Sequence, residues 1–122
     1  MTSNTNSQEE RRCALQAKLD DHKSQAERNM LGQFSTPTQL ARDVLAYGLA
    51  LLPKDEPVKF LDPAIGTGSF YSALMSTCRG RPVALAQGYE IDPYYGKPAL
   101  ALWESSQLQI TLGDFTRQTS PS

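Results

Sequence analysis

Hydrophobic and polar residues are distributed unevenly along the chain. Residues 1–30 are almost entirely polar, whereas residues 31–115 show the apolar periodicities of an α/β core. The polar composition of residues 1–8 predicts a disordered tail. Residues 9–30 contain good helix formers and neither proline nor glycine, but their apolar residues are too sparse for a buried face. We therefore predict a solvated helix there, packed along one edge.

A second helix is predicted from Pro37 to Leu52. Thr36 is a suitable N-cap, proline is favoured at the first helical position, and Pro53 ends the helix. The apolar residues recur at spacings of three and four, which predicts a stripe that faces the core. The residues of this stripe are Leu40, Val44, Leu45, Leu49 and Leu52.

From residue 58 onwards, short apolar runs alternate with helical segments. Strands are predicted at residues 58–61, 83–89 and 108–112, and helices at residues 69–78 and from Pro93. This alternation implies parallel strands joined by right-handed crossovers. The predicted fold class is therefore α/β.

Each of the three predicted strands ends in an acidic residue, namely Asp62, Glu90 and Asp114. In sheets of this kind, ligands bind beyond the carboxyl ends of the strands. The sequence therefore predicts one site at this edge of the sheet. Taken alone, Glu90 is also consistent with a surface residue at a strand end, and Asp114 with a turn aspartate after Gly113.

A glycine-rich turn, residues 62–68, connects the first strand to its helix. Glycines allow the backbone to approach a ligand closely. A dinucleotide-binding fingerprint fits poorly, because its third glycine would fall at Tyr71 and because the Asp62 carboxylate would repel a pyrophosphate. A cationic ligand suits Asp62, and S-adenosylmethionine carries both a sulfonium and an ammonium group. Glu90 would then accept hydrogen bonds from the ribose hydroxyls.

The residues beside these acids suit the adenosyl group of the same ligand. Ile91 follows Glu90 and offers an apolar face for the adenine ring. Asp114 has a carboxylate that can accept a hydrogen bond from the exocyclic amine, and Phe115 can pack against the ring. These positions complete a candidate adenosyl site.

The composition restricts the partners and the compartment. Twelve basic against 13 acidic residues give a net charge of -1, so the chain lacks the basic stripe of a protein that grips a phosphate backbone by itself. Cys13 and Cys78 match no metal or disulfide spacing and are interpreted as free thiols. The longest apolar stretch, residues 44–52, is too short to span a membrane. We expect a soluble cytoplasmic protein without a metal, in which His22 faces solvent.

The chain resembles the N-terminal part of the class I, S-adenosylmethionine-dependent DNA methyltransferases that modify adenine at N6. The closest pattern is the γ arrangement, in which the cofactor half precedes the target-base half, and modification subunits of restriction systems are similar. Four family elements occur in the family's order across residues 32–115. They are Gly32-Gln33-Phe34-Ser35-Thr36-Pro37, the turn Asp62-Pro63-Ala64-Ile65-Gly66-Thr67-Gly68, Glu90-Ile91-Asp92-Pro93, and Gly113-Asp114-Phe115.

This resemblance implies a partial Rossmann-like class I methyltransferase fold with three parallel strands in the order 3-2-1, preceded by an N-terminal helix. It divides the chain into a tail and helix (1–31), a cofactor-binding half-domain (32–115) and a polar tail (116–122). The first strand would lie at an exposed edge, an aggregation hazard. Phe34, Thr36 and Pro37 would line the methionine end of the cofactor, although the element containing them is by itself consistent with a plain helix cap. The implied S-adenosylmethionine contacts are Phe34, Thr36, Pro37, Asp62, Ala64, Gly66, Gly68, Glu90, Ile91, Asp114 and Phe115.

The family's catalytic element, Asn/Asp/Ser-Pro-Pro-aromatic, does not occur in the sequence. Asp92-Pro93-Tyr94-Tyr95 imitates it only superficially. We therefore expect the cofactor-binding portion of a site-specific DNA adenine-N6 methyltransferase that is inactive alone and reaches DNA through a complementary half or chain. The alternatives are a non-catalytic cofactor-binding or partner-pairing module, and a fragment of a class I methyltransferase acting on RNA or protein.

Overall fold

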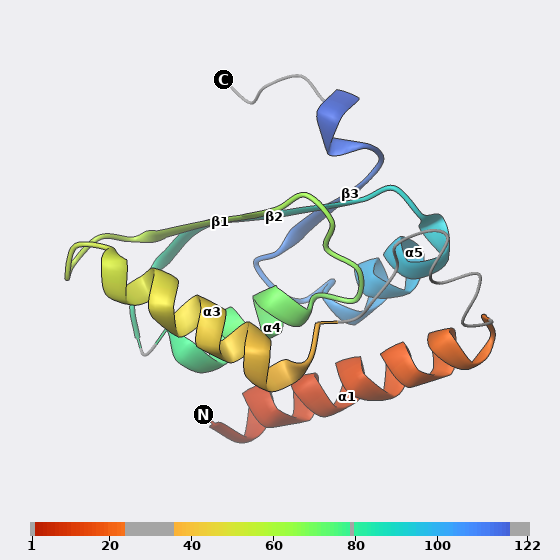
Figure 1. Cartoon of the computed structure of the whole chain (residues 1–122), viewed down its shortest axis with the longest axis horizontal. Helices are drawn as coiled ribbons and strands as arrows, with labels where there is room; N and C mark the ends of the chain where they lie inside the picture. The colour runs from red at the N-terminus through yellow and green to blue at the C-terminus, as the bar shows by residue number, and fades with distance from the viewer. Residues whose placement is uncertain (1, 24–35, 79, 118–122) are drawn as a thin grey trace.

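The computed structural model describes residues 2–23, 36–78 and 80–117, which form a three-stranded sheet with helices on one side (Figure 1). The elements in chain order are α1 (Thr2–Asp21), α3 (Thr38–Leu51), β1 (Val58–Asp62), α4 (Ser69–Thr77), β2 (Val83–Glu90), α5 (Pro93–Leu102), β3 (Gln109–Leu112) and the 3-10 helix η1 (Phe115–Arg117). The predicted strands and the helices that follow them therefore occur within one or two residues of their expected bounds.

The three strands are parallel and lie in the order β1-β2-β3. Asp62 at the end of β1 pairs with Gly88, and Glu90 at the end of β2 pairs with Leu112. The carboxyl ends of all three strands consequently meet at one edge. Both the predicted α/β class and the predicted 3-2-1 order are confirmed.

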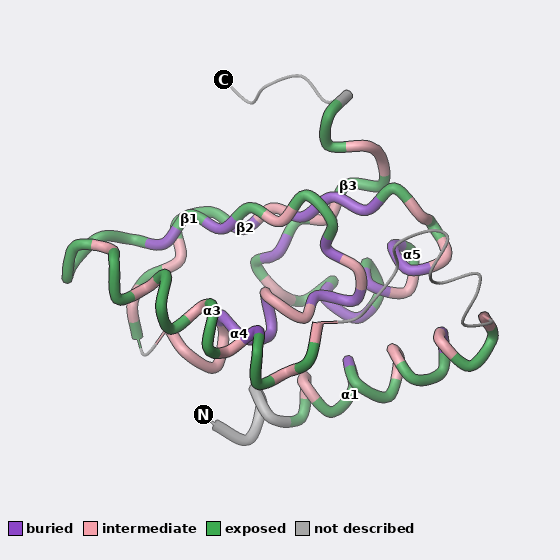
Figure 2. Tube along the Cα trace, in the orientation of Figure 1, coloured by how far each residue is buried: buried purple, intermediate pink, exposed green. Residues whose placement is uncertain are grey.

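The hydrophobic core lies between the sheet and the helices (Figure 2). Phe60 of β1 and Ala86 of β2 are buried on this face of the sheet. The ring of Tyr71 from α4 meets Phe60 edge to face at 5.8 Å and Trp103, just after α5, at 5.1 Å. This aromatic row connects β1 to α4 and to the end of α5, and it holds the two helices in place against the sheet.

The opposite face of the sheet is largely uncovered by helices (Figure 1). Leu61 of β1 and Leu85 of β2 are 50% and 42% exposed there. Parallel sheets are normally covered on both faces, because their strands are apolar on both sides. β1 also ends the sheet, as expected for an exposed edge strand.

Helix α3 packs against α4, and three residues of the predicted stripe, Leu45, Leu49 and Leu52, pack against the core. Leu40 and Val44 are exposed, whereas Ala41 is completely buried. The buried stripe is therefore rotated towards Ala41 relative to the predicted one, because the small side chain of Ala41 allows the closer approach. The helix also begins one residue later than predicted, with Pro37 rather than Thr36 in the cap position.

The N-terminal region departs most from the prediction. Residues 2–8, expected to be a disordered tail, form the first turns of α1, which ends at Asp21. The helix is polar, yet Arg12 and Leu19 are buried against the rest of the fold. It is therefore held by specific polar contacts, which a hydrophobic pattern does not reveal. Residues 24–30 of the predicted helix lie outside the described residues, and the proposed domain boundaries remain predictions.

Within the described ranges, no helix is both long enough and apolar enough to cross a membrane.

Candidate functional site

The glycine-rich turn between β1 and α4 folds back over the end of β2. The backbone N–H of Ile65 donates to the carbonyl of Tyr89 at 2.8 Å, and the N–H of Gly68 donates to the carbonyl of Ile65 at 2.9 Å. Gly88 makes this approach possible, since a Cβ there would lie 2.9 Å from the Ile65 side chain. Because residue 88 is a glycine, the turn can lie directly against the end of β2.

Glu90 connects the turns that follow β1 and β2. Its Oε1 accepts a hydrogen bond from the N–H of Gly66 at 2.8 Å, and its Oε2 accepts one from the N–H of Asp92 at 3.0 Å. The side chain is buried. Each carboxylate oxygen can accept a further hydrogen bond. The structure therefore brings Glu90 beside the glycine turn, as the predicted site requires.

Asp62 has one satisfied and one unsatisfied carboxylate oxygen. Oδ1 accepts a hydrogen bond from the N–H of Ala64 at 3.0 Å, whereas the buried Oδ2 has no partner among the described residues. Burial raises the pKa of Asp62, and the hydrogen bond from Ala64 opposes this shift. A buried acceptor without a partner is unfavourable. The site therefore fits a ligand that brings a cation or a hydrogen-bond donor to Asp62.

The two glycines of the turn have different surroundings. Gly66 has a φ of +56°, and a Cβ built there would meet nothing within 4 Å, so open space lies beside the backbone. Gly68 has a φ of +97°, and its Cβ would lie 2.5 Å from Nε1 of Trp103. That nitrogen donates to the carbonyl of Thr67 at 2.8 Å. Gly66 thus leaves room for a ligand. Position 68 must be a glycine because a side chain there would collide with Trp103, and this cause cannot be read from the sequence of the turn alone.

The predicted adenine-binding residues lie at the ends of β2 and β3. Ile91 is 69% exposed and is thus available for contact. Phe115 meets the ring of Tyr89 edge to face at 5.1 Å. Oδ1 of Asp114 accepts hydrogen bonds from the N–H and the hydroxyl of Thr116 at 2.9 and 2.7 Å, the contacts of a turn aspartate. The adenine contacts of Ile91, Asp114 and Phe115 remain predictions.

Two of the three residues predicted at the methionine end are described. Thr36 is half-buried and Pro37 is exposed at the start of α3, and Phe34 lies outside the described residues. The positive end of the α3 macrodipole lies at this point, which favours a ligand carboxylate. Their contacts to a cofactor stay predictions, as does that of Ala64, which is exposed in the glycine turn.

The segment that imitates a catalytic element has a structural role. Asp92 caps α5 by accepting a hydrogen bond from the N–H of Tyr94 at 2.9 Å, and it also pairs with Nζ of Lys23 at 3.2 Å. The hydroxyl of Tyr95 donates to Oδ1 of Asp20 at 2.8 Å. These contacts dock the end of α1 on the start of α5. No group of three His, Cys, Asp or Glu side chains in the described part of the chain could hold a metal ion.

No protein-family model matches this chain. Its fold is similar to that of a Listeria monocytogenes protein assigned to the class I S-adenosylmethionine-dependent methyltransferases, with a TM-score of 0.65 and 23% sequence identity. The similarity covers 88% of this chain and 34% of the Listeria protein, so the chain spans about a third of that protein's length. The fold is therefore a partial, Rossmann-like class I methyltransferase fold, and the fold predicted from the sequence is confirmed.

Proposed function

We propose that this chain binds S-adenosylmethionine across the carboxyl ends of β1, β2 and β3, as the cofactor-binding portion of a DNA adenine-N6 methyltransferase. The observation that carries the proposal is the buried Oδ2 of Asp62, which has no hydrogen-bond partner among the described residues and adjoins a turn with open space at Gly66. A ligand that is cationic near Asp62 would satisfy this oxygen, and a nicotinamide dinucleotide, with its anionic pyrophosphate, would not.

Residues of this chain would contact both the methionine part and the adenosyl part of the cofactor. Asp62 and the start of α3 at Thr36 would hold the methionine part, and Glu90 would hold the ribose hydroxyls. Ile91 and Phe115 would contact the adenine ring. When bound, S-adenosylmethionine supplies an electrophilic methyl group on its sulfonium.

The adenine acceptor is proposed from the sequence elements shared with the N6-adenine enzymes, in particular residues 32–37. A net charge of -1 offers little attraction to duplex phosphates. DNA would therefore be gripped by another segment or by a complementary chain. Two features support pairing with such a partner. The apolar sheet face at Leu61 and Leu85 is exposed, and β1 has a free edge at the end of the sheet. We propose a cytoplasmic location for this assembly.

Calorimetric titration tests cofactor binding. The chain is expected to bind S-adenosylmethionine and its demethylated product, and not to bind NAD. Ile91→Ser should weaken binding about tenfold, because partial burial of the isoleucine side chain against the adenine ring contributes about 1.4 kcal/mol, somewhat less than complete burial would. Leu51→Ser is the matched control, because Leu51 is also 69% exposed but lies at the far end of α3. Tighter binding of NAD, or equal losses in the two variants, would contradict the proposed site.

The 122 residues alone are expected to transfer no methyl group to DNA. Transfer to adenine N6 requires the base outside the stack, held at its amine and aligned with the sulfonium methyl. Incubation of the protein with labelled cofactor and mixed-sequence DNA should give no incorporation above the blank. Addition of a chain that supplies an Asn-Pro-Pro-Tyr element should restore incorporation if β1 pairs with it. Methylation by the 122 residues alone would show that a base-binding element is present after all.

A further inference from the structure

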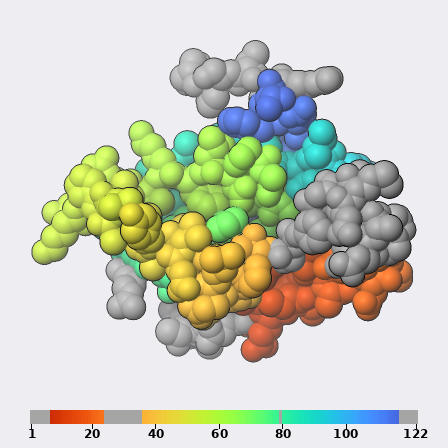
Figure 3. Space-filling model, in the orientation of Figure 1, coloured from red at the N-terminus to blue at the C-terminus, as the bar shows by residue number. Residues whose placement is uncertain are grey.

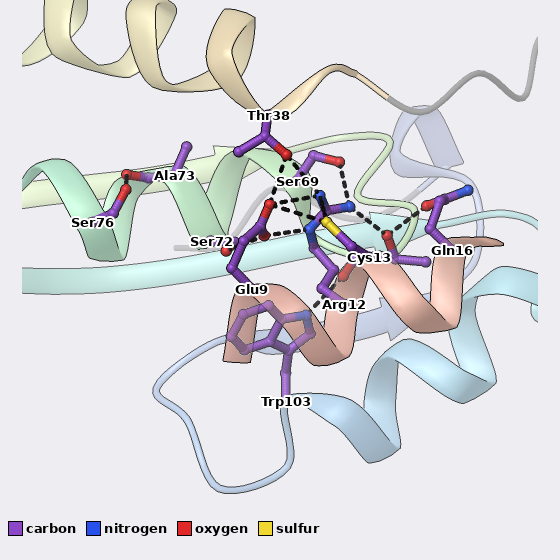
Figure 4. A network of polar contacts seen from close by, with 11 residues as sticks. Glu9, Arg12, Cys13, Gln16, Thr38, Ser69, Ser72, Ala73, Ser76 and Trp103 are labelled. Carbon is purple, nitrogen blue, oxygen red and sulfur yellow. Dashed lines mark hydrogen bonds and ion pairs between the residues drawn. The ribbon is translucent and has the colours of Figure 1, made fainter. Parts of the chain in front are cut away.

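An ion pair on α1, formed by the buried Arg12 and the partly buried Glu9, lies between the glycine turn and the starts of α3 and α4 (Figure 4). The guanidinium of Arg12 is only 2% exposed and contacts Glu9 through two atoms, with Nε at 2.7 Å from Oε1 and Nη2 at 3.0 Å from Oε2. Two parallel hydrogen bonds of this kind fix orientation as well as distance. The pair is therefore a rigid unit within the helix.

Arg12 holds the glycine turn and the first residue of α4. Its Nη1 donates to Oγ1 of Thr67 at 3.1 Å and to Oγ of Ser69 at 3.0 Å. The hydroxyl of Thr67 then donates to Oε1 of Gln16, one turn further along α1, at 2.6 Å. Thr67 lies between Gly66 and Gly68, so both hydroxyl contacts act on the part of the turn that adjoins the candidate site.

Glu9 holds the first turns of two helices. It accepts hydrogen bonds from the hydroxyl of Ser72 in α4 and from that of Thr38 in α3, both at 2.7 Å. Burial opposes ionisation, but the hydrogen bonds from Arg12, Ser72 and Thr38 outweigh it and lower the pKa of Glu9 to about 2. Thr38 directly follows Thr36 and Pro37, so the same carboxylate reaches the segment predicted to hold the methionine end.

Neither α3 nor α4 is capped by a side chain at its N-cap position, where Pro37 and Gly68 stand. Glu9 places a negative charge at the starts of both helices, where the positive ends of their macrodipoles lie. In Figure 3, α1 lies directly against the start of α3. Through Glu9, α1 thus supplies a negative charge and contacts to two hydroxyl groups at helix starts that have no side-chain cap.

We infer that Glu9 and Arg12 are positioning residues of the cofactor site, which hold the glycine turn in register with the Thr36–Pro37 segment. This inference rests on the proposed binding of S-adenosylmethionine. The physical reason is that a buried ion pair contributes little net stability compared with an apolar pair of similar volume, but it fixes one geometry. The two segments are far apart in the sequence, and the pair contacts the glycine turn at Thr67 and the residue directly after Pro37, Thr38.

The test compares Arg12→Met, Arg12→Lys and the double variant Glu9→Gln/Arg12→Met with the unaltered chain. Arg12→Met leaves the Glu9 carboxylate without its ion-pair partner and lowers stability, so affinity is measured on the folded fraction. The double variant removes both charges and restores much of the stability. Val58→Ala is the stability-matched control, because Val58 is buried at the other end of β1.

Titration with the demethylated cofactor should show about a tenfold loss of affinity in Arg12→Met and in the double variant, equivalent to about 1.4 kcal/mol. Arg12→Lys, which keeps a charge opposite Glu9, should recover part of the loss. Val58→Ala should bind as the unaltered chain does. An affinity for the double variant within about twofold of the unaltered chain would overturn the inference, as would an equal loss in Val58→Ala.

Amide hydrogen exchange of the ligand-free protein separates this inference from the proposed function. Arg12→Met should accelerate exchange at residues 66–69 by about tenfold relative to Val58→Ala, because the hydroxyl contacts that hold the turn are lost. If the unaltered chain binds no S-adenosylmethionine, the proposed function fails. Faster exchange at residues 66–69 in Arg12→Met would still show that Arg12 holds the glycine turn in position. Unchanged exchange at residues 66–69 would overturn the positioning role, whatever the titration shows.

Discussion

Gly68→Ala is expected to destabilise the fold by about 3 kcal/mol or more, a large part of the stability of a small domain. Three effects add at this position. The φ of +97° is unfavourable for alanine, the new Cβ would lie 2.5 Å from Nε1 of Trp103, and the hydrogen bond from Trp103 to Thr67 would be displaced. Trp103 belongs to the aromatic row of the core, so its displacement spreads to Tyr71.

Gly66→Ala is the matched variant, two residues earlier in the same turn. Its φ of +56° also disfavours alanine, but the space around the new Cβ is open, so a loss of only about 1 kcal/mol is expected. Urea unfolding followed by circular dichroism measures both free energies. Calorimetric titration should find that Gly66→Ala also weakens cofactor binding, because the methyl group would occupy the space beside the turn. Equal stabilities of the two variants would show that Trp103 does not determine the glycine at position 68.

Acid is expected to remove a second large contribution, which comes from the ion pair on α1. The pKa of Glu9 is lowered from 4.5 to about 2, so the ionised form is stabilised in the folded protein. Its contribution is fully present above pH 4.5 and is lost as the pH falls towards 2. At about 1.4 kcal/mol for each pKa unit the shift sets an upper limit of about 3 kcal/mol, and solvent screening at this partly exposed carboxylate reduces the expected contribution to about 1–2 kcal/mol.

The difference in unfolding free energy between the unaltered chain and Glu9→Gln isolates this contribution, because the other carboxylates are common to both. The difference should be near its full value at pH 7 and should shrink steadily below pH 4.5. Glu10→Gln neutralises an exposed neighbour on the same helix and should stay within about 0.5 kcal/mol of the unaltered chain at pH 7. A constant difference between pH 7 and pH 2.5 would show that Glu9 is not held ionised by Arg12.

The sequence was sufficient to predict the α/β class and the positions of the three strands. Short apolar runs between helical segments require parallel strands, and β1, β2 and β3 begin within one residue of the predicted positions. The resemblance added the strand order, which the pairing confirms. Asp62 and Glu90 were predicted at the ligand edge because they end their strands, and the structure brings both to the glycine turn.

The tertiary structure decided the features that depend on contacts between distant residues. Spacing placed Leu45, Leu49 and Leu52 on the core side of α3 correctly, but it did not reveal that Ala41, rather than Leu40 or Val44, faces the core, because all three positions are apolar. The helix start at Pro93 was predicted from the sequence, but only the structure shows that Asp92 and Tyr95 dock it on the end of α1 and the residues that follow, through Lys23 and Asp20.

The role of α1 was the least predictable feature, for a physical reason. Hydrophobic patterns identify a buried helix by its apolar stripe, whereas α1 is held by Glu9, Arg12 and Gln16 through hydrogen bonds to Thr67 and other hydroxyl groups. Such polar contacts carry no periodic signal, because each depends on a partner from another element. The sequence by itself therefore determined the sheet and the edge at which its strand-end acids meet, and only the tertiary structure decided what holds the glycine turn in place.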